Sequence, residues 1–230
     1  MGMYSNISST ASLIGDPTRT SILVALADGR ALPAGELATL AKVSPQTASA
    51  HLTKLVEGKL VTVETQGRYR YYRLANAEVA DAIEAIATIS PPLKIRSLRE
   101  SSHKKALDFA RTCYGHIAGK FGVALTQSLI ELGYLHDLEG VYQVTDKGKR
   151  WLLDFSIESL PQKVNLNAIP QHIDWTVRKH HMAGPLALAI TRRLLDLGWI
   201  EQGSIRRSIR ITEKGRQKIF KEFGIDTNSL

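Results

Sequence analysis

The chain has 230 residues, of which 43% are hydrophobic and 23% charged, and its formal net charge is +8. This length and composition are typical of two modest globular domains, or of one domain with a sizeable extension. Its apolar runs are too short to cross a bilayer, and the N-terminus shows no export signal. The single cysteine, Cys113, excludes an internal disulfide framework and fits a reducing compartment. We therefore expect a cytoplasmic protein with no membrane partner.

The positive charge is unevenly distributed along the chain. Residues 1–93 contain 8 basic and 8 acidic side chains, residues 94–120 contain 7 and 2, and residues 121–230 contain 15 and 12. A basic total permits a polyanionic partner but does not establish one. The positions of individual side chains must therefore decide whether the protein binds nucleic acid.

Two helices are predicted before residue 44. Residues 16–30 fit a helix because Asp16 can cap it, Pro17 suits its first turn and Gly29 follows its end. Residues 33–43 fit a shorter helix that buries its leucines.

A third helix is predicted to begin at Ser44, a hydroxyl N-cap that is followed by proline. Apolar residues recur at helical spacing on one of its sides: Ala48, Leu52, Leu55 and Val56. Its other side is small and polar, and no acidic residue occurs between Glu36 and Glu57. The tight turn between the second and third helices predicts a helix-turn-helix.

A β-hairpin and another helix follow. Residues 60–74 alternate in polarity around a turn at Gln66-Gly67, and they carry Arg68 and Arg70 near the turn. Residues 76–90 fit a helix that ends before two prolines. Helix, helix-turn-helix, basic hairpin and helix is the order of a winged helix.

The stretch "SPQTASAHLTKLVEGKLV" with the following "GRYRYYRL" resembles the ArsR/SmtB class of bacterial transcriptional regulators, over about the first 90 residues. This resemblance implies a repressor that binds a palindromic operator in double-stranded DNA. It also implies a homodimer assembled through the first predicted helix and the helix at 76–90. Two metal sites common in that class need cysteine or histidine at positions that lack them here, so those two sites are absent; we assign no metal ligand in the winged helix and expect no cofactor.

The start of the third helix is the part that reaches base edges in helix-turn-helix proteins. Glutamine, serine and threonine there can hydrogen-bond bases, while a lysine and the wing arginines suit phosphates or the minor groove. The predicted DNA-binding residues are Ser44, Gln46, Thr47, Ser49, Ala50, His51, Thr53, Lys54, Arg68 and Arg70. A merely solvated polar face is the alternative, and His51 also fits a packing role.

The rest of the chain begins with a predicted basic connector helix at 94–112 and then contains an internal repeat. "HIAGKFGVALTQSLIELGYL" (116–135) matches "HMAGPLALAITRRLLDLGWI" (181–200), and "YQVTDKGKRWLLDF" (142–155) matches "IRITEKGRQKIFKEF" (209–223). Each copy predicts a helix, a hairpin and a second helix that is capped by threonine.

We therefore expect a mainly α fold with small β-hairpin wings, in the α+β class. Residues 1–93 would form the winged helix-turn-helix domain for DNA binding and dimerisation, followed by the connector. Residues 113–230 would form a C-terminal domain of two degenerate winged-helix-like repeats, at about 113–160 and 178–226.

A candidate effector site follows from the repeat, because His116 and His181 occupy equivalent "H-x-A-G" positions. The predicted effector-binding residues are Cys113, His116, Trp175, Arg178 and His181. Packing of the two repeats, a pocket for a small-molecule effector and a metal site all stay open. Cys113 fits a buried thiol, an oxidant sensor or a ligand.

The leading interpretation is a DNA-binding repressor controlled by an unknown effector through the C-terminal domain. The alternatives are a constitutive or architectural DNA-binding regulator without an effector, and a winged-helix module that binds protein. The sequence contains no nucleophile elbow, phosphate loop, metal-hydrolase motif or paired catalytic carboxylates, so we do not expect an enzyme.

Overall fold

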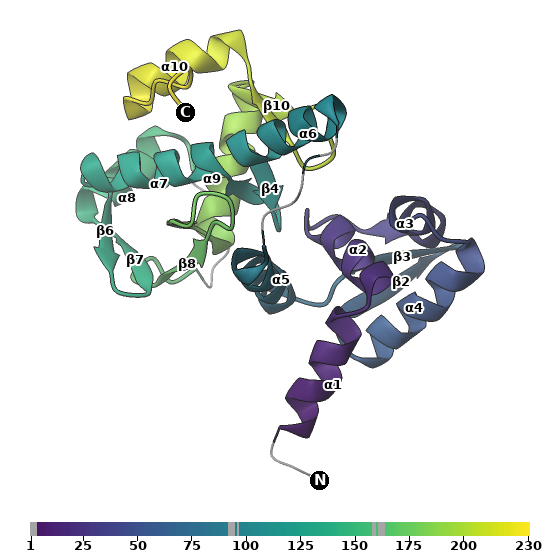
Figure 1. The fold of residues 1–230 in the computed structure, drawn as a ribbon. Coiled ribbons are helices and arrows are strands. Elements are labelled where there is room, and N and C mark those ends of the chain that lie inside the picture. The colour runs from purple at the N-terminus through teal and green to yellow at the C-terminus, as the bar shows by residue number, and fades with distance from the viewer. Residues whose placement is uncertain (1–3, 92–94, 96, 158–159, 161–163) are drawn as a thin grey trace. The chain divides into compact units, whose positions relative to one another are not determined.

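The computed structural model describes residues 4–91, 95, 97–157, 160 and 164–230. Its contacts divide the chain into two compact units, Met1–Ile83 and Glu84–Leu230. The first runs from purple to blue in Figure 1, and the second from teal to yellow. The division falls earlier in the chain than the domain boundary predicted at residue 93.

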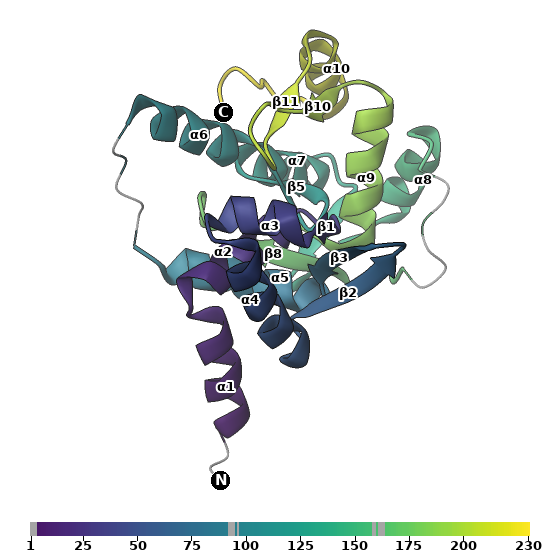
Figure 2. The same ribbon diagram turned by 90° about the vertical axis from the view of Figure 1, so that its right-hand side faces the viewer.

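The first unit is a winged helix with an additional N-terminal helix. Its elements are α1 (Ser5–Ile14), α2 (Pro17–Leu26), β1 (Leu32–Pro33), α3 (Ala34–Ala41), α4 (Pro45–Glu57), β2 (Val61–Gln66), β3 (Tyr69–Leu74) and the first part of α5 (Ala77–Ile89). The strands form an antiparallel sheet in the order β1-β3-β2. The predicted helices and hairpin are present, whereas α1 and β1 were not predicted. Figures 1 and 2 show α1 extending away from the rest of this unit.

Leucines from three helices form the core of the first unit. Leu23 and Leu26 of α2, Leu37 of α3, and Leu52 and Leu55 of α4 have no exposed surface. Because α4 repeats its apolar residues at helical spacing, it buries one side and leaves the other in solvent.

The second unit begins with the last part of α5, and α6 (Leu98–Phe109) follows, which occupies most of the predicted connector. Its remaining elements are β4 (Arg111–Cys113), β5 (His116–Ala118), α7 (Lys120–Glu131), β6 (Leu135–Leu138), β7 (Val141–Val144), α8 (Asp146–Asp154), β8 (Ile169–Ile173), β9 (His180–Met182), α9 (Gly184–Asp196), β10 (Ile200–Gln202), β11 (Ile209–Ile211) and α10 (Glu213–Phe223). After α6, the order hairpin, helix, hairpin, helix therefore occurs twice. The two hairpins β6–β7 and β8–β9 join into one four-stranded sheet.

The repeated "T-x-K-G" motif has the same structural role in both copies. The hydroxyl of Thr145 caps α8 by accepting from the Gly148 amide at 2.9 Å, and the hydroxyl of Thr212 caps α10 by accepting from the Gly215 amide at 2.9 Å. A Cβ at Gly215 would lie 1.8 Å from the carbonyl oxygen of Trp199. A Cβ at Gly148, the corresponding residue of the first copy, would lie 2.1 Å from the carbonyl oxygen of Tyr134. Glycine is therefore required for each helix start to lie against the preceding hairpin.

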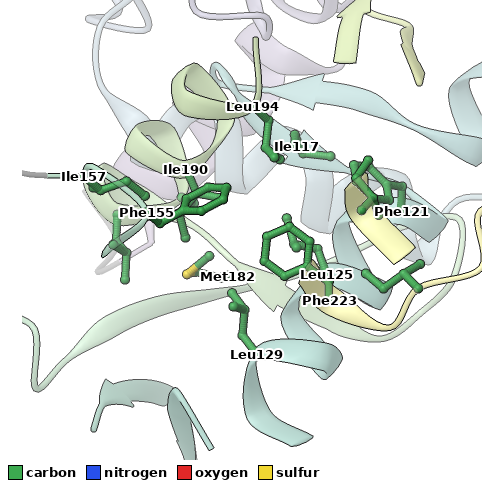
Figure 3. Close-up of a cluster of buried hydrophobic side chains, with 14 of the residues drawn as sticks. Ile117, Phe121, Leu125, Leu129, Phe155, Ile157, Met182, Ile190, Leu194 and Phe223 are labelled. Carbon is green, nitrogen blue, oxygen red and sulfur yellow. The ribbon is translucent and has the colours of Figure 1, made fainter. Parts of the chain in front are cut away.

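The two copies share one hydrophobic core, in which α7 and α9 supply facing side chains, as Figure 3 shows. Backbone-to-side-chain hydrogen bonds cross between the copies in a reciprocal way. The Ile117 amide donates to the Thr191 hydroxyl at 3.2 Å, and the equivalent Met182 amide donates to the Thr126 hydroxyl at 2.9 Å. The expectation that the two halves pack together is met by this core. Their interpretation as degenerate winged helices stays a prediction.

Candidate nucleic-acid interface and effector site

The helix α4 presents a polar face to solvent from a firmly fixed N-terminus. The side chain of Ser44 accepts a hydrogen bond from the Thr47 amide at 3.1 Å, which caps the helix as predicted. Before it, Lys42 adopts a left-handed conformation with φ of 56°, and this residue ends α3 and turns the chain. The exposed residues on the face are Gln46, Thr47, Ser49, Ala50, Thr53 and Lys54.

Hydrogen-bonding groups on this face remain available for a partner. The Thr53 hydroxyl donates to the Ser49 carbonyl at 3.0 Å, which leaves its oxygen lone pairs free to accept. The face has no carboxylate, and an α-helix with its side chains is about as wide as the major groove of DNA. The arrangement can therefore approach base edges without repelling phosphates.

His51 is placed differently from the other nine predicted DNA-binding residues, all of which are exposed. It is half-buried, and its Nδ1 lies 3.5 Å from the carboxylate of Asp16, the residue that caps α2. The hydrogen bond from the Arg19 amide is the main cause of the lowered pKa of Asp16, and the charges of Arg19 and His51 lower it further. This contact joins His51 to the start of α2, and its predicted contact with DNA stays a prediction.

The wing is the hairpin of β2 and β3. Gln66 pairs with Tyr69, so the loop is Gly67-Arg68, and Gly67 has a φ of 61° that suits glycine. The Arg68 guanidinium lies 5.1 Å from the centre of the Tyr69 ring, and Arg70 is exposed on β3. By contrast, Arg73 is paired with Glu64 at 2.8 Å. Arg68 and Arg70 are thus exposed near the tip, whereas Arg73 already has a counter-charge.

The capped polar helix, its left-handed turn and the arginine-bearing hairpin define a winged helix-turn-helix DNA-binding protein. Residues 14–64 match a family described as a helix-turn-helix domain. The chain is also 45% identical over 224 residues to an uncharacterized HTH-type transcriptional regulator, YdfF of Bacillus subtilis (strain 168), covering 97% of this chain and 99% of that protein. The chain belongs to this family of HTH-type transcriptional regulators, which confirms the predicted function of a DNA-binding transcriptional regulator.

Solved structures similar to the chain cover a smaller part of it. A homodimeric winged helix-turn-helix DNA-binding domain from Mycobacterium bovis, described as a possible ArsR-family transcriptional regulator, is 28% identical with a TM-score of 0.36, over 38% of this chain and 80% of that one. The transcriptional repressor BigR from Xylella fastidiosa is 24% identical with a TM-score of 0.35, over 38% and 88% of the two chains. Among the described residues, no helix is both long and apolar enough to span a membrane.

In the second unit, Cys113, His116 and His181 of the predicted effector site lie together, and His172 joins them. Cys113 and His116 are opposite one another across the β4–β5 hairpin, and His172 is opposite His181 across β8–β9. The Nε2 atoms of His116 and His181 are 3.2 Å apart. We call these four side chains the Cys-His cluster.

Burial favours the neutral forms of Cys113, His116 and His181. It raises the pKa of the Cys113 thiol, an effect that the nearby Glu84 carboxylate reinforces. It lowers the pKa of His116 well below the usual range and that of His181 to about 4. Since the thiolate is the reactive form of cysteine, a buried thiol that holds its proton is not suited to oxidant sensing.

A buried network of charges lies beside the cluster. Arg111, which is 1% exposed, is 3.2 Å from Glu84 and 3.0 Å from Asp174, and Arg207 is 3.2 Å from the second oxygen of Glu84. Although burial raises the pKa of Asp174, the Arg111 charge and hydrogen bonds from Thr176, Val177 and Gly119 outweigh it, so that this pKa is lowered. The two positive charges of the arginines equal the two negative charges of the carboxylates. This pairing offsets part of the free-energy cost of burying the four charges.

Two of the predicted effector-binding residues stand apart from the cluster. Trp175 stacks on the Arg111 guanidinium, which lies 4.8 Å from its ring centre. Arg178 is exposed, and its amide donates to the Asp174 carbonyl at 2.7 Å. Within the first copy, the Gly119 amide at the start of α7 donates to the Asp174 carboxylate at 2.6 Å, so a protein carboxylate occupies this helix N-terminus.

Sequence reasoning missed His172, Arg111 and Glu84. The repeat drew attention to the equivalent pair His116 and His181, but His172 has no histidine at its equivalent position. Only the prediction of strand β8, with its alternation of sides, would have placed His172 next to His181.

Proposed function

We propose that the protein is a cytoplasmic, homodimeric repressor that binds a palindromic operator and responds to an effector bound in its second unit. The exposed, acid-free face of α4 is the observation that carries the proposal, and it comes with a wing whose Arg68 and Arg70 are exposed. The N-terminal half of α4 reads bases through Gln46 and Ser49, and Lys54 contacts phosphate.

Exposed apolar residues support the dimer. On the predicted dimer helices, Val24 of α2 is 39% exposed, and Ile86 and Ile89 of α5 are 42% and 84% exposed. Tyr4 and Ile7 at α1, a helix that was not part of the predicted dimer surface, are 69% and 65% exposed. Large apolar side chains gathered on exposed helices mark surfaces that bind another protein, and a second copy of the same chain would bury them. Two copies also double the number of phosphate contacts, which a single winged helix needs for firm binding.

The helix α5 supplies a route for effector control. It continues from the first unit into the second, where its Glu84 pairs with Arg111 and Arg207. An effector that changes this buried network in one of two states would move α5. It would thereby change the ratio of DNA-competent to DNA-incompetent forms. This coupling requires the effector to bind the two forms with different affinity.

The base-reading role is tested with the double variant Gln46→Ala/Ser49→Ala. An operator is first selected by the wild-type protein from a library of random duplexes, and binding is measured by fluorescence anisotropy on that operator and on an unrelated duplex. We expect the variant to lose roughly 10- to 100-fold of its preference for the operator, since a good bidentate base contact contributes about 1–3 kcal/mol. Gln217→Ala on α10 is the control, because Gln217 is exposed but lies outside the predicted interface. Equal losses on both duplexes would contradict base reading.

The wing is tested with Arg68→Ala/Arg70→Ala, and Arg73→Ala is its matched control because Arg73 already pairs with Glu64. The logarithm of DNA affinity is measured against the logarithm of salt concentration. Removing two phosphate contacts should reduce the slope by about 2, since each contact contributes about 0.9. An unchanged slope in the double variant would mean that the wing does not contact phosphate, and would favour a winged helix that binds protein.

A further inference from the structure

We propose that the Cys-His cluster is a binding site for one transition-metal ion of the zinc type, with Cys113, His116 and His172 as ligands and His181 completing a tetrahedron. The site lies wholly within the second unit. It therefore goes beyond the proposed function, and it does not depend on whether the first unit binds an operator.

The backbone brings the four side chains together as two cross-strand pairs. In "C-Y-G-H", Tyr114 and Gly115 have φ values of 47° and 89°, which makes a tight two-residue hairpin turn. Cys113 and His116 flank this turn as direct partners, and such partners project to the same face of a hairpin. The pair His172 and His181 does the same on β8 and β9. Each hairpin thus supplies two side chains, and the cluster forms where the hairpins face one another.

The distances suit a tetrahedral ion. The ligand atoms of Cys113, His116 and His172 lie within 4.8 Å of one another, and the Nε2 atoms of His116 and His181 are 3.2 Å apart. Zinc bonds of about 2.0–2.1 Å to nitrogen and 2.3 Å to sulfur imply neighbouring ligand atoms about 3.3–3.7 Å apart. The His116–His181 distance already fits, and the separations among Cys113, His116 and His172 need to shorten by at most about 1.5 Å, within the reach of side-chain rotation.

The donor set selects the class of metal. A thiolate and imidazoles bind zinc, cobalt and copper, whereas magnesium and calcium require oxygen ligands. Cys113, His116 and His181 are buried, whereas His172 is partly exposed, so the ion would be shielded from water on most sides. When no ion is bound, the facing Nε2 atoms of His116 and His181 can form a hydrogen bond only if one carries the proton, whereas an ion uses both lone pairs.

The surrounding charges permit a cation. Arg111 and Arg207 are balanced by Glu84 and Asp174, so the adjoining network is neutral overall. On binding, the ion takes the place of the Cys113 proton, which is released to solvent, because a coordinating thiol is deprotonated. The cluster then gains one net positive charge, next to the carboxylate of Glu84.

The proposal is tested on the full-length protein, purified under reducing conditions, stripped with a chelator and titrated with Co²⁺. We expect one Co²⁺ per chain, a thiolate-to-cobalt charge-transfer band in the near ultraviolet, and visible bands of tetrahedral intensity that Zn²⁺ removes. A spectrum of octahedral cobalt without the charge-transfer band, or substantially less than one ion per chain, would overturn the proposal.

Single variants then locate the ion. Cys113→Ser and Cys113→Ala should each remove the charge-transfer band, and His172→Asn should weaken Zn²⁺ binding by roughly 100-fold or more in competition with a chromophoric chelator. His180→Asn is the matched control, because His180 is the exposed neighbour of His181 on β9 and belongs to no pair of the cluster. If His180→Asn weakens binding as much as His172→Asn, the ion is on the surface and the proposal fails.

Folding of each variant is checked by tryptophan emission, since the three tryptophans of the chain all lie in the second unit. Zn²⁺ should also raise the unfolding temperature of the wild type and of His180→Asn, but not that of Cys113→Ala. An equal rise in all three would contradict the assignment. Operator binding measured on the same samples distinguishes a missing metal site from a failure of the proposed function.

Discussion

The two units use polar side chains in opposite ways. In the first, nine of the ten residues predicted to contact DNA are exposed at α4 and on the wing, and the core beneath them is made of leucines. In the second, polar groups lie inside the fold: Arg111, His116, Asp174 and His181 are all at most 2% exposed. An exposed polar face costs the fold almost nothing, whereas a buried polar group must be matched by partners. Substitution of the exposed polar side chains of the first unit should therefore alter mainly DNA affinity, whereas substitution of the buried polar side chains of the second should alter stability.

The largest effect is expected from Arg111→Ala, which leaves Asp174 and Glu84 buried without this partner. Breaking a buried ion pair costs about 3–5 kcal/mol. Urea unfolding followed by tryptophan emission reports the second unit. Arg210→Ala is the control, because the pair of Arg210 with Glu201 is exposed and should contribute less than about 1 kcal/mol. Comparable losses of stability in both variants would contradict the larger cost that we assign to the buried network.

Gly215→Ala should destabilise the second unit next most strongly. The added Cβ would lie 1.8 Å from the Trp199 carbonyl oxygen, so the start of α10 must move. Overpacking of this kind costs about 1–3 kcal/mol or more, again measured by urea unfolding and tryptophan emission. Gly148→Ala should behave alike, because its Cβ would meet the Tyr134 carbonyl oxygen at 2.1 Å. A large difference between the two variants would weaken the equivalence of the repeats.

Ser44→Ala should cost about 1 kcal/mol, the usual contribution of an N-cap. Because the first unit has no tryptophan, amide hydrogen exchange over α4 is the suitable measurement. The tryptophan transition of the second unit should not change. Thr53→Ala on the same exposed face is the control, and we expect it to leave exchange in the first turn of α4 unaltered.

Gly35→Ala should have the smallest effect and the opposite sign. Gly35 is exposed within α3, and no atom lies within 4 Å of the position that its Cβ would take. Replacing glycine by alanine inside a helix stabilises by roughly 0.5–1 kcal/mol. Slower amide exchange in the first unit would show it, whereas faster exchange would mean that α3 tolerates no side chain at this position.

Much of the first unit could be predicted because its signals are local. Asp16 and Ser44 cap their helices, Gly67 is in the turn of the wing, and α4 follows the predicted stripe. The helix α1 was missed because no capping side chain marks its start, and β1 because two residues carry no period. His51 was ambiguous because a side chain at the edge of a stripe can turn either way, and the structure places it against Asp16.

By itself, the sequence determined the helix-turn-helix, the exposed, acid-free face of α4, the arginines of the wing and the existence of two related halves in the rest of the chain. Each of these depends on spacing within a short segment, where backbone preference and hydrophobic period act directly. The tertiary structure alone decided that His172 joins Cys113, His116 and His181, and that Glu84 meets Arg111. Those contacts join strands and helices far apart in the chain, and no local preference encodes which distant partner a buried polar group will find.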